Sequence, residues 1–135
     1  KPCNIVISDK DQDLTLIDWG SGTFRLDEQQ PHPEVVTTLW WRPPEAHKKI
    51  LKDPFKGDVW SAGCVFAGLY KLSPLFQLKK STPGIPWKYL MKEEMFHVSK
   101  IAPPSRYKII TKMLQINPSD RITAQECLEL LKTLK

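Results

Sequence analysis

The first twenty residues contain two short apolar runs separated by a polar segment. Ile5–Ile7 and Leu14–Ile17 are rich in residues that favour strands, and Ser8–Asp13 has the composition of a turn. This pattern predicts a β-hairpin at the beginning of the chain.

The predicted hairpin would bring two oxygen-bearing side chains together. If Ile5 pairs with Ile17, Asn4 lies opposite Asp18, and cross-strand neighbours are about 5 Å apart. Mg²⁺ accepts one or two such hard oxygen ligands and leaves its other positions to phosphates and water. A surface hairpin with an exposed Asp is the alternative interpretation, and these two residues alone do not exclude it.

A long polar loop precedes the helical part of the sequence. Residues 21–36 contain Gly, Asp, Gln and two prolines, and loops of this length are usually functional or disordered. Residues 56–69 follow, with apolar residues on every face from Val59 to Leu69, which predicts a helix in the middle of the core. Asp58, near the start of this helix, would interact favourably with the positive end of the helix dipole.

Further helices are predicted toward the C-terminus. One candidate spans residues 87–96, and another spans 105–116 and is stopped by Asn117-Pro118. The last helix begins at Thr123, which has capping-box spacing with Glu126. Its inner face is expected to consist of apolar residues, namely Ala124, Cys127, Leu128, Leu131 and Leu134. The expected fold class is therefore α+β, mainly α-helical, with a β-hairpin that carries the metal-binding residues.

Composition limits the class of protein. The 135 residues form one domain's worth of chain, and 41% hydrophobic and 26% charged residues are ordinary for a globular protein. The longest apolar run, Val59–Tyr70, is too short to span a bilayer, so no membrane association is expected. Cys3, Cys64 and Cys127 are odd in number and scattered, which favours reduced thiols and an intracellular location, cytoplasmic or nuclear.

The net charge of +5 and the pI near 9.1 raise nucleic acid as a possible partner. Lysines cluster at positions 48, 49, 52 and 56, but aromatic and basic residues do not alternate as in RNA-recognition motifs, and zinc-finger spacing is absent from the sequence. A solvated basic face that attracts phosphate or acidic peptides is the favoured interpretation.

Five short segments resemble the motifs of one family. Lys1–Asn4 resembles the end of H-R-D-L-K-P-x-N, Asp18–Gly20 resembles D-F-G, and Pro43–Glu45 resembles A-P-E. Asp58–Cys64 matches D-V-W-S-x-G-C, and Asn117–Arg121 matches the arginine motif before the last helix. In this order and spacing they resemble the C-terminal lobe of a eukaryotic-type protein kinase.

Finer features resemble the CMGC group of kinases. Val35–Arg42 resembles the V-V-T-L-W-Y-R of cyclin-dependent kinases with one residue inserted, and Gly20–Phe24 and Arg42–Glu45 are similar to LAMMER kinases. The Asp-Trp-Gly form of the metal motif is similar to casein kinase II. Lys1 and Thr38 follow the serine/threonine pattern and not the tyrosine pattern.

The resemblance implies roles for the matching residues. Asn4 and Asp18 would hold Mg²⁺ against the phosphates of ATP, and Lys1 would place an ammonium beside the transferred phosphoryl group. Thr38 would form a hydrogen bond with the catalytic loop.

Other residues are expected to shape the substrate loop and the helical core, namely Arg42, Glu45, Asp58 and Arg121. The resemblance implies a buried ion pair between Glu45 and Arg121. The general-base Asp would lie two residues before Lys1, outside this sequence, as would the N-terminal lobe. Residues 1–135 are thus expected to be the C-terminal part of a catalytic domain and to be inactive alone.

The resemblance also implies the partners. A protein substrate with a Ser or Thr acceptor, a regulatory subunit and the missing N-terminal lobe are expected. A pseudokinase or truncated lobe that acts as a binding module is the alternative function. Cys3 stands where basophilic kinases have a glutamate, so a preference for basic substrate sites is not expected.

Overall fold

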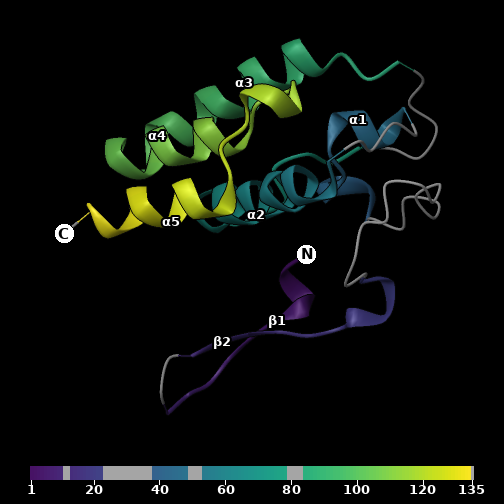
Figure 1. The fold of residues 1–135 in the computed structure, drawn as a ribbon. Helices are drawn as coiled ribbons and strands as arrows, with labels where there is room; N and C mark the ends of the chain where they lie inside the picture. Colours follow the sequence, from purple (N-terminus) through teal and green to yellow (C-terminus); the bar gives the residue numbers. More distant parts are fainter. Residues whose placement is uncertain (11–12, 23–37, 49–52, 79–83, 135) are drawn as a thin grey trace.

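Helix α2 runs through the centre of the protein, and α3, α4 and α5 pack against it (Figure 1). The structure is a computed structural model, and it describes residues 1–10, 13–22, 38–48, 53–78 and 84–134. Its strands and helices are β1 (Ile5–Ile7), β2 (Leu14–Leu16), α1 (Pro44–His47), α2 (Pro54–Lys71), α3 (Trp87–Ile101), α4 (Pro104–Met113) and α5 (Ala124–Lys132). Single 3₁₀ turns occur at Pro2–Asn4, Trp19–Ser21, Leu39–Trp41 and Pro118–Asp120. A small β-hairpin is thus combined with several helices, as predicted.

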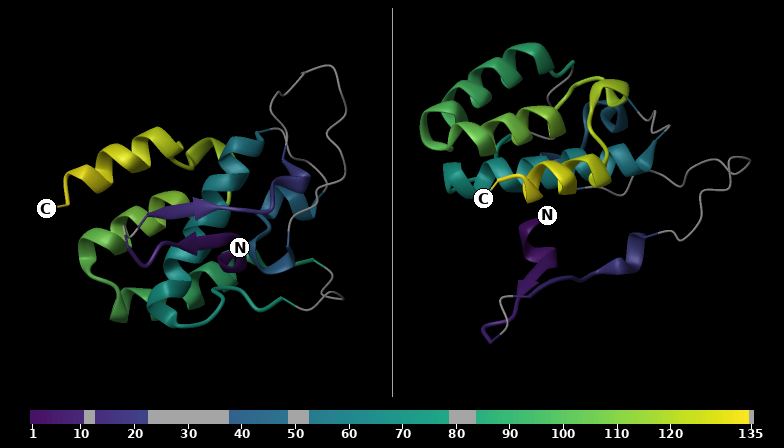
Figure 2. Two further views of the ribbon diagram at one scale, coloured as in Figure 1. Left: turned by 90° about the horizontal axis from the view of Figure 1, so that it is seen from below. Right: turned by 60° about the vertical axis from the view of Figure 1, so that its left-hand side comes forward.

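The hairpin lies on the side of α2 that faces away from α3 (Figure 1 and the right-hand view of Figure 2). Helices α3 and α4 contact each other on the other side, and α5 contacts both α2 and α4. Most of the predicted long loop, and Lys49 and Lys52 of the predicted lysine cluster, lie outside the described residues.

Local sequence signals explain the ends of α2. The carboxylate of Asp53 accepts a hydrogen bond from the backbone N–H of Lys56 (3.0 Å), and Pro54 occupies the first turn. The helix ends at Lys71, and the residue that caps it, Leu72, has a left-handed conformation (φ 56°). Because α2 starts earlier than the sequence predicted, Asp58 lies beyond its first turn, and the prediction that Asp58 faces the positive end of the helix is wrong.

The core is built on one face of α2. Trp60 is fully buried and stacks on Phe76 with 5.8 Å between ring centroids, and the edge of Trp87 meets both rings. Gly63 allows α4 to approach closely, since a Cβ atom there would lie 3.0 Å from Cβ of Met113. The opposite face is less buried than predicted, because the apolar residue Leu69 is exposed.

The C-terminal helices follow the prediction with shifted ends. Helix α3 continues past residue 96 to Ile101, and α4 starts at Pro104 and ends before residue 116. The capping box of α5 is confirmed, since Thr123 Oγ1 accepts from Glu126 N (3.1 Å) and Glu126 Oε2 accepts from Thr123 N (2.6 Å).

The predicted inner face of α5 is correct only in part. Cys127 is buried, and Leu131 and Leu134 pack beside it. Ala124 and Leu128 are exposed instead, because α5 lies at the edge of the helical body and contacts α2 and α4 on one side. The buried stripe is therefore narrower than the apolar stripe of the sequence.

The register of the hairpin differs from the prediction by one residue. Ile5 pairs with Leu16, so the predicted pairing of Ile5 with Ile17 is wrong. The turn is closed by a hydrogen bond from Ser8 N to Asp13 O (2.9 Å), and this closure sets the register.

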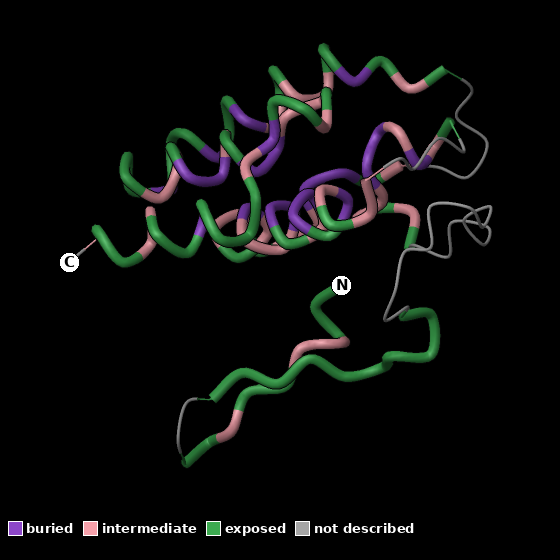
Figure 3. The backbone as a smooth tube through the Cα atoms, viewed as in Figure 1, coloured by how far each residue is buried: buried purple, intermediate pink, exposed green. Residues whose placement is uncertain are grey.

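Both faces of the hairpin are exposed. Figure 3 shows that the buried residues lie among the helices, whereas β2 is exposed throughout its length. Ile7 and Leu14 are each about 60% exposed (61% and 60%). The apolar residues of both strands are thus largely uncovered in this chain. Among the described residues, no helix combines the length and apolar character needed to cross a membrane.

Candidate functional site

Three polar side chains converge at the open end of the hairpin. The carboxylate of Asp18 accepts a hydrogen bond from Nδ2 of Asn4 (3.3 Å), and Nζ of Lys1 lies 3.7 Å from the same oxygen, Oδ2. The 3₁₀ turn at Pro2–Asn4 places Lys1 and Asn4 on one side, with Asn4 N bonded to Lys1 O (3.0 Å). The structure therefore brings together three residues that the sequence nominated.

Asp18 reaches Asn4 by a different route from the predicted strand pairing. Ile17, and not Asp18, lies opposite Asn4 in the hairpin, because the backbone N–H of Ile17 donates a hydrogen bond to the carbonyl of Asn4 (2.9 Å). Asp18 then adopts a left-handed conformation (φ 65°, ψ 61°), which is uncommon for a residue other than glycine. This local turn compensates for the one-residue difference in register. Trp19 supports it by donating a hydrogen bond from Nε1 to the carbonyl of Leu16 (3.0 Å).

The cluster is open to solvent. The side chain of Asp18 is 59% exposed, so its ion pair with Lys1 contributes little to stability. Its chemical value is an accessible carboxylate beside an amide and an ammonium. Asp18 has one amide neighbour and belongs to no group of three or more His, Cys, Asp or Glu side chains within the described residues. This donor set fits a magnesium ion that takes most of its ligands from phosphate and water, and does not fit a protein-enclosed metal.

Thr38 lies at the start of the second segment that the sequence nominated. It precedes the 3₁₀ turn Leu39–Trp41, and its carbonyl accepts from Trp41 N (3.0 Å). The hydroxyl of Ser61 on α2 donates to the carbonyl of Trp41 (2.9 Å), which ties this segment to the central helix. The hydrogen bond expected between Thr38 and the catalytic loop stays a prediction.

Glu45 and Arg121 form an ion pair across the helical body. The carboxylate of Glu45, on α1, accepts two hydrogen bonds from the guanidinium of Arg121, at 2.9 and 3.2 Å. Arg121 is only 1% exposed. The two residues are far apart in the sequence, so their pairing fastens α1 to the segment before α5.

Sequence reasoning missed the other partners of Arg121. Its guanidinium also donates to the carbonyls of Gln115 (2.9 and 3.2 Å) and Lys56 (2.6 Å), and it lies 5.0 Å from a ring centroid of Trp60. Nζ of Lys56 in turn donates to the carbonyl of Arg121. Backbone carbonyls accept most of these bonds, and a carbonyl has no signature in the sequence.

Arg42 directly follows the 3₁₀ turn Leu39–Trp41, and its charge affects the pKa of a histidine in α1. Its backbone N–H donates to Leu39 O (3.4 Å). Burial, with the nearby charge of Arg42, lowers the pKa of His47, whose ring lies 5.4 Å from that of Trp87. Asp58 is exposed on α2. These residues border the helical body and do not join the cluster at the hairpin.

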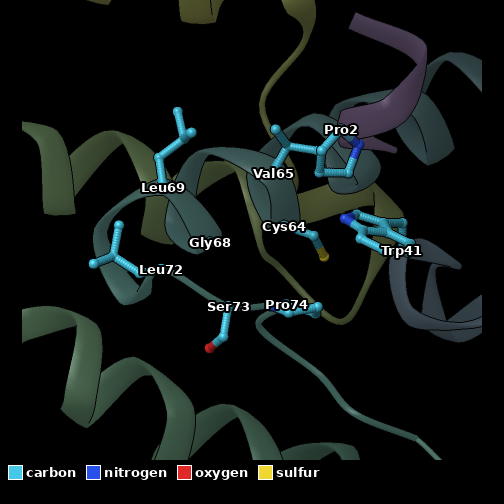
Figure 4. A pocket seen from close by; sticks show the side chains of 9 residues that line it. All are labelled: Pro2, Trp41, Cys64, Val65, Gly68, Leu69, Leu72, Ser73 and Pro74. Atoms are coloured by element: carbon cyan, nitrogen blue, oxygen red, sulfur yellow. The ribbon is translucent and has the colours of Figure 1, made fainter.

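A small cavity lies between the N-terminal turn and α2 (Figure 4). It has a volume of about 230 Å³, and its lining includes Pro2, Trp41, Cys64 and Leu69. Burial raises the pKa of the Cys64 thiol far above its usual range, so this thiol is not a nucleophile. The residues that line the cavity are mainly apolar, and Lys1, Asn4 and Asp18 are not among them, so the cavity is not a phosphate site.

Comparison with known proteins identifies the family. The sequence model of the protein kinase domain matches residues 1–130. The chain belongs to the protein kinase family. The segment matched includes all five motifs on which the sequence resemblance was based, and so that resemblance is confirmed.

The kinase is similar to members of the CMGC group. It is 38% identical over 122 residues to the human MAPK/MAK/MRK overlapping kinase, covering 85% of this chain and 24% of that protein. It is 28% identical over 158 residues to cyclin-dependent kinase 12 of Drosophila melanogaster, covering 93% of this chain and 13% of that protein. The resemblance to CMGC kinases is therefore confirmed. The chain spans well under half of the length of these two relatives.

A solved structure shows the same fold. The MAP kinase LMAMPK10 from Leishmania major superposes with a TM-score of 0.69 and 25% sequence identity. The match covers 100% of this chain and 49% of that kinase. The fold is thus protein kinase-like, helical with a small two-stranded sheet.

Proposed function

We propose that residues 1–135 form the C-terminal lobe of a serine/threonine protein kinase that transfers the γ-phosphoryl group of ATP to a protein. The observation that carries this proposal is the convergence of Lys1 and Asn4 on the carboxylate of Asp18. These residues match the catalytic-loop and metal motifs of the family. A scaffold would not need an ammonium, an amide and a carboxylate at one open position.

Asn4 and Asp18 would hold Mg²⁺ in this kinase. Bound Mg²⁺ neutralises charge on the phosphates. The amide of Asn4 presents its nitrogen to Asp18, and rotation of the amide about the Cβ–Cγ bond exchanges that nitrogen for the oxygen. Lys1 would stabilise the negative charge that develops on the transferred group, because its ammonium already lies at this position.

The serine/threonine specificity rests on Lys1 and Thr38, which follow that pattern. Glu45 and Arg121 would keep the substrate loop in place, because their bonds fasten α1 to the helical body. The protein substrate would approach between these two regions, and the N-terminal lobe would cover the exposed apolar side of the hairpin. A regulatory subunit is a further expected partner of the whole kinase.

A binding module without catalysis is the second candidate. The exposure of Ile7, Leu14 and Trp19 on the hairpin favours it, because exposed apolar patches recruit partners. The two candidates differ in their need for the charge of Asp18, so this residue is the one to test.

The deciding experiment uses the whole kinase that contains this sequence. Asp18→Asn should lower Mg²⁺-dependent phosphorylation at least about a hundredfold, because a neutral amide cannot balance the phosphates. Calorimetry should show weaker binding of Mg²⁺-ADP, and the melting temperature should not change. Phosphoamino acid analysis of a generic acceptor should find phosphoserine or phosphothreonine.

Asp9→Asn is the matched control. Asp9 is exposed in the turn of the same hairpin, so this variant makes the same charge change away from Lys1 and Asn4. It should retain normal activity. Near-normal activity of Asp18→Asn would contradict the enzyme assignment and favour the binding module.

A further inference from the structure

The outer face of α3 carries a stripe of exposed aromatic and basic side chains. Tyr89 is 66% exposed and Phe96 is 58% exposed. They are seven residues apart, which is about two turns of a helix, and Lys100 follows one turn later. The other side of α3 is buried in the core, through Trp87, Met95 and Val98. The stripe therefore points away from the helical body.

Contacts within α3 position the exposed ring. Nζ of Lys100 lies 5.0 Å from the ring centroid of Phe96, which is a cation–π contact. The ring of His97 meets that of Phe96 at 6.0 Å between centroids. Phe96 is thus held on the outside by its own helix, and its ring is available to a partner.

The charges around the stripe are mostly positive. Lys88 and Lys92 are exposed one turn apart on one side of the rings, whereas Glu93 is exposed on the other side. Glu94 belongs to the inner side, where it pairs with Lys71 at 2.5 Å. Together with Lys100, the lysines outnumber the single exposed glutamate, so the face attracts negative charge.

We propose that this face of α3, defined by Tyr89, Lys92, Phe96 and Lys100, is a docking surface for an acidic amphipathic helix of a partner protein. Two rings one heptad apart match the spacing of apolar residues on a facing helix. Acidic residues along one edge of that helix would pair with Lys88 and Lys92. The rings of Tyr89 and Phe96 would supply most of the apolar area buried in the interface, and the lysines would favour a partner with acidic residues.

The surface lies away from the cluster at the hairpin. Helix α3 and the hairpin are on opposite sides of α2, so a partner on α3 leaves Lys1, Asn4 and Asp18 accessible (Figures 1 and 2). The docking surface is therefore independent of phosphoryl transfer. It would recruit a substrate or regulator without blocking the site.

Two other occupants fit this face less well. A second copy of the chain would bring lysine-rich faces together, and like charges repel. The bases of a nucleic acid strand could stack on the rings. Its backbone carries a phosphate at every nucleotide, however, so some phosphates would lie beside the carboxylate of Glu93 and be repelled by it. An acidic peptide can place its charges on the lysine side alone.

The test measures binding of a fluorescent synthetic peptide to the 135-residue chain by anisotropy. The probe is an amphipathic helix of about 18 residues, with leucines at heptad spacing and glutamates on one edge. Phe96→Ala and Tyr89→Ala should each raise Kd at least about tenfold, because aromatic anchors dominate such interfaces. Leu128→Ala on α5 is the control, since Leu128 is also exposed (47%) but lies off the stripe, and it should leave Kd unchanged.

Charge reversals on the two edges give opposite expectations. Lys92→Glu should raise Kd about twofold to fivefold, and Glu93→Lys should lower it by a similar factor, as expected for exposed ion pairs. Both residues are exposed, so neither change disturbs the core. Circular dichroism confirms that each variant is folded.

Several results would overturn the proposal. An equal loss of binding in Leu128→Ala, or the same direction of change for both charge reversals, would show non-specific adsorption. Tighter binding of a single-stranded oligonucleotide that also depends on Phe96 would assign the face to nucleic acid. Self-association that is abolished by Phe96→Ala would assign it to a second copy.

Discussion

The helical body buries several of its largest side chains, whereas most large apolar side chains of the hairpin face the solvent. Trp60 and Arg121 are almost completely inaccessible, and each contacts several elements. Trp19 and Leu14 have no comparable cover, although they belong to the same chain. The helical body thus contains a core of its own, and the described part of the hairpin contains none.

The part of the protein that contains the stable core is therefore not the part that holds the candidate site. A two-stranded hairpin is marginally stable by itself in water, so β1 and β2 depend on covering partners for a fixed geometry. The candidate site lies on this weakly supported element, at Asp18. Ion pairs show the same contrast, because Glu45–Arg121 is buried and Lys1–Asp18 is exposed. Under the proposed function, the helical body would be the support, and the hairpin would carry the reactive groups.

Hydrogen exchange should show the largest difference between the two regions. Amides of β1 and β2 in the isolated chain should exchange at least about a thousandfold faster than buried amides of α2 and α4, because a hairpin without a core opens locally. Mass spectrometry of deuterated peptides measures both regions in one sample. Equal protection of hairpin and helices would show that the hairpin is held more firmly than its exposure indicates.

Removal of the buried cation should have the next largest effect. Arg121→Ala should destabilise the helical body by about 3–5 kcal/mol, because Glu45 is left buried without a partner. Urea denaturation measures the loss, and Arg121→Lys should recover part of it. Lys132→Ala, which breaks the exposed pair with Glu129 (3.0 Å), should cost less than about 1 kcal/mol. Similar losses in the two alanine variants would contradict the burial of Arg121.

A pair of glycines compares packing in the two regions directly. Gly63→Ala should destabilise α2 and α4 by about 1–3 kcal/mol, since the added Cβ would lie 3.0 Å from Met113 Cβ and from Leu114 Cδ2. Gly20→Ala should be nearly neutral, because the nearest atom to its added Cβ is Asp18 Oδ1 at 3.9 Å. Thermal denaturation measures both. A neutral Gly63→Ala would show that α4 can move away from α2.

Local signals predicted part of this structure from the sequence. The capping box at Thr123 and Glu126 depends on residues three apart, so its spacing is visible in the chain. The register of the hairpin was missed because it depends on which backbone groups close the turn at Ser8 and Asp13. Asp53 was missed as the cap of α2, because the apolar pattern begins only later, at Val59.

The contact between Glu45 and Arg121 was predictable only through the family resemblance. Periodicity cannot pair Glu45 with Arg121, and their pairing was expected from the kinase motifs alone. The hairpin pattern and the same motifs both nominated Asn4 and Asp18, and the structure places them together despite the wrong register. The bonds from Arg121 to backbone carbonyls could not be predicted, because every residue has a carbonyl.

The smallest expected effect is a pH dependence of the helical body that the hairpin should not share. Burial and the charge of Arg42 lower the pKa of His47 in the folded protein, although a hydrogen bond from the His47 ring to the backbone of Arg42 opposes them. Within the described residues, Nε2 of His47 is buried without a hydrogen-bond partner. Protonation is therefore less favourable in the folded state than in the unfolded state.

The sign of the effect follows from linkage. A folded pKa below the unfolded value of 6.5 means that the stability from neutral His47 is complete above pH 6.5 and is lost as the pH falls through 6.5 toward the folded pKa. The slope should not exceed about 1.4 kcal/mol per pH unit for one group. Urea denaturation from pH 7.5 to 5.5 should show this loss, and His47→Gln should reduce it. An equal slope in that variant would assign the pH dependence to other groups, and His47 would then not distinguish the helical body from the hairpin.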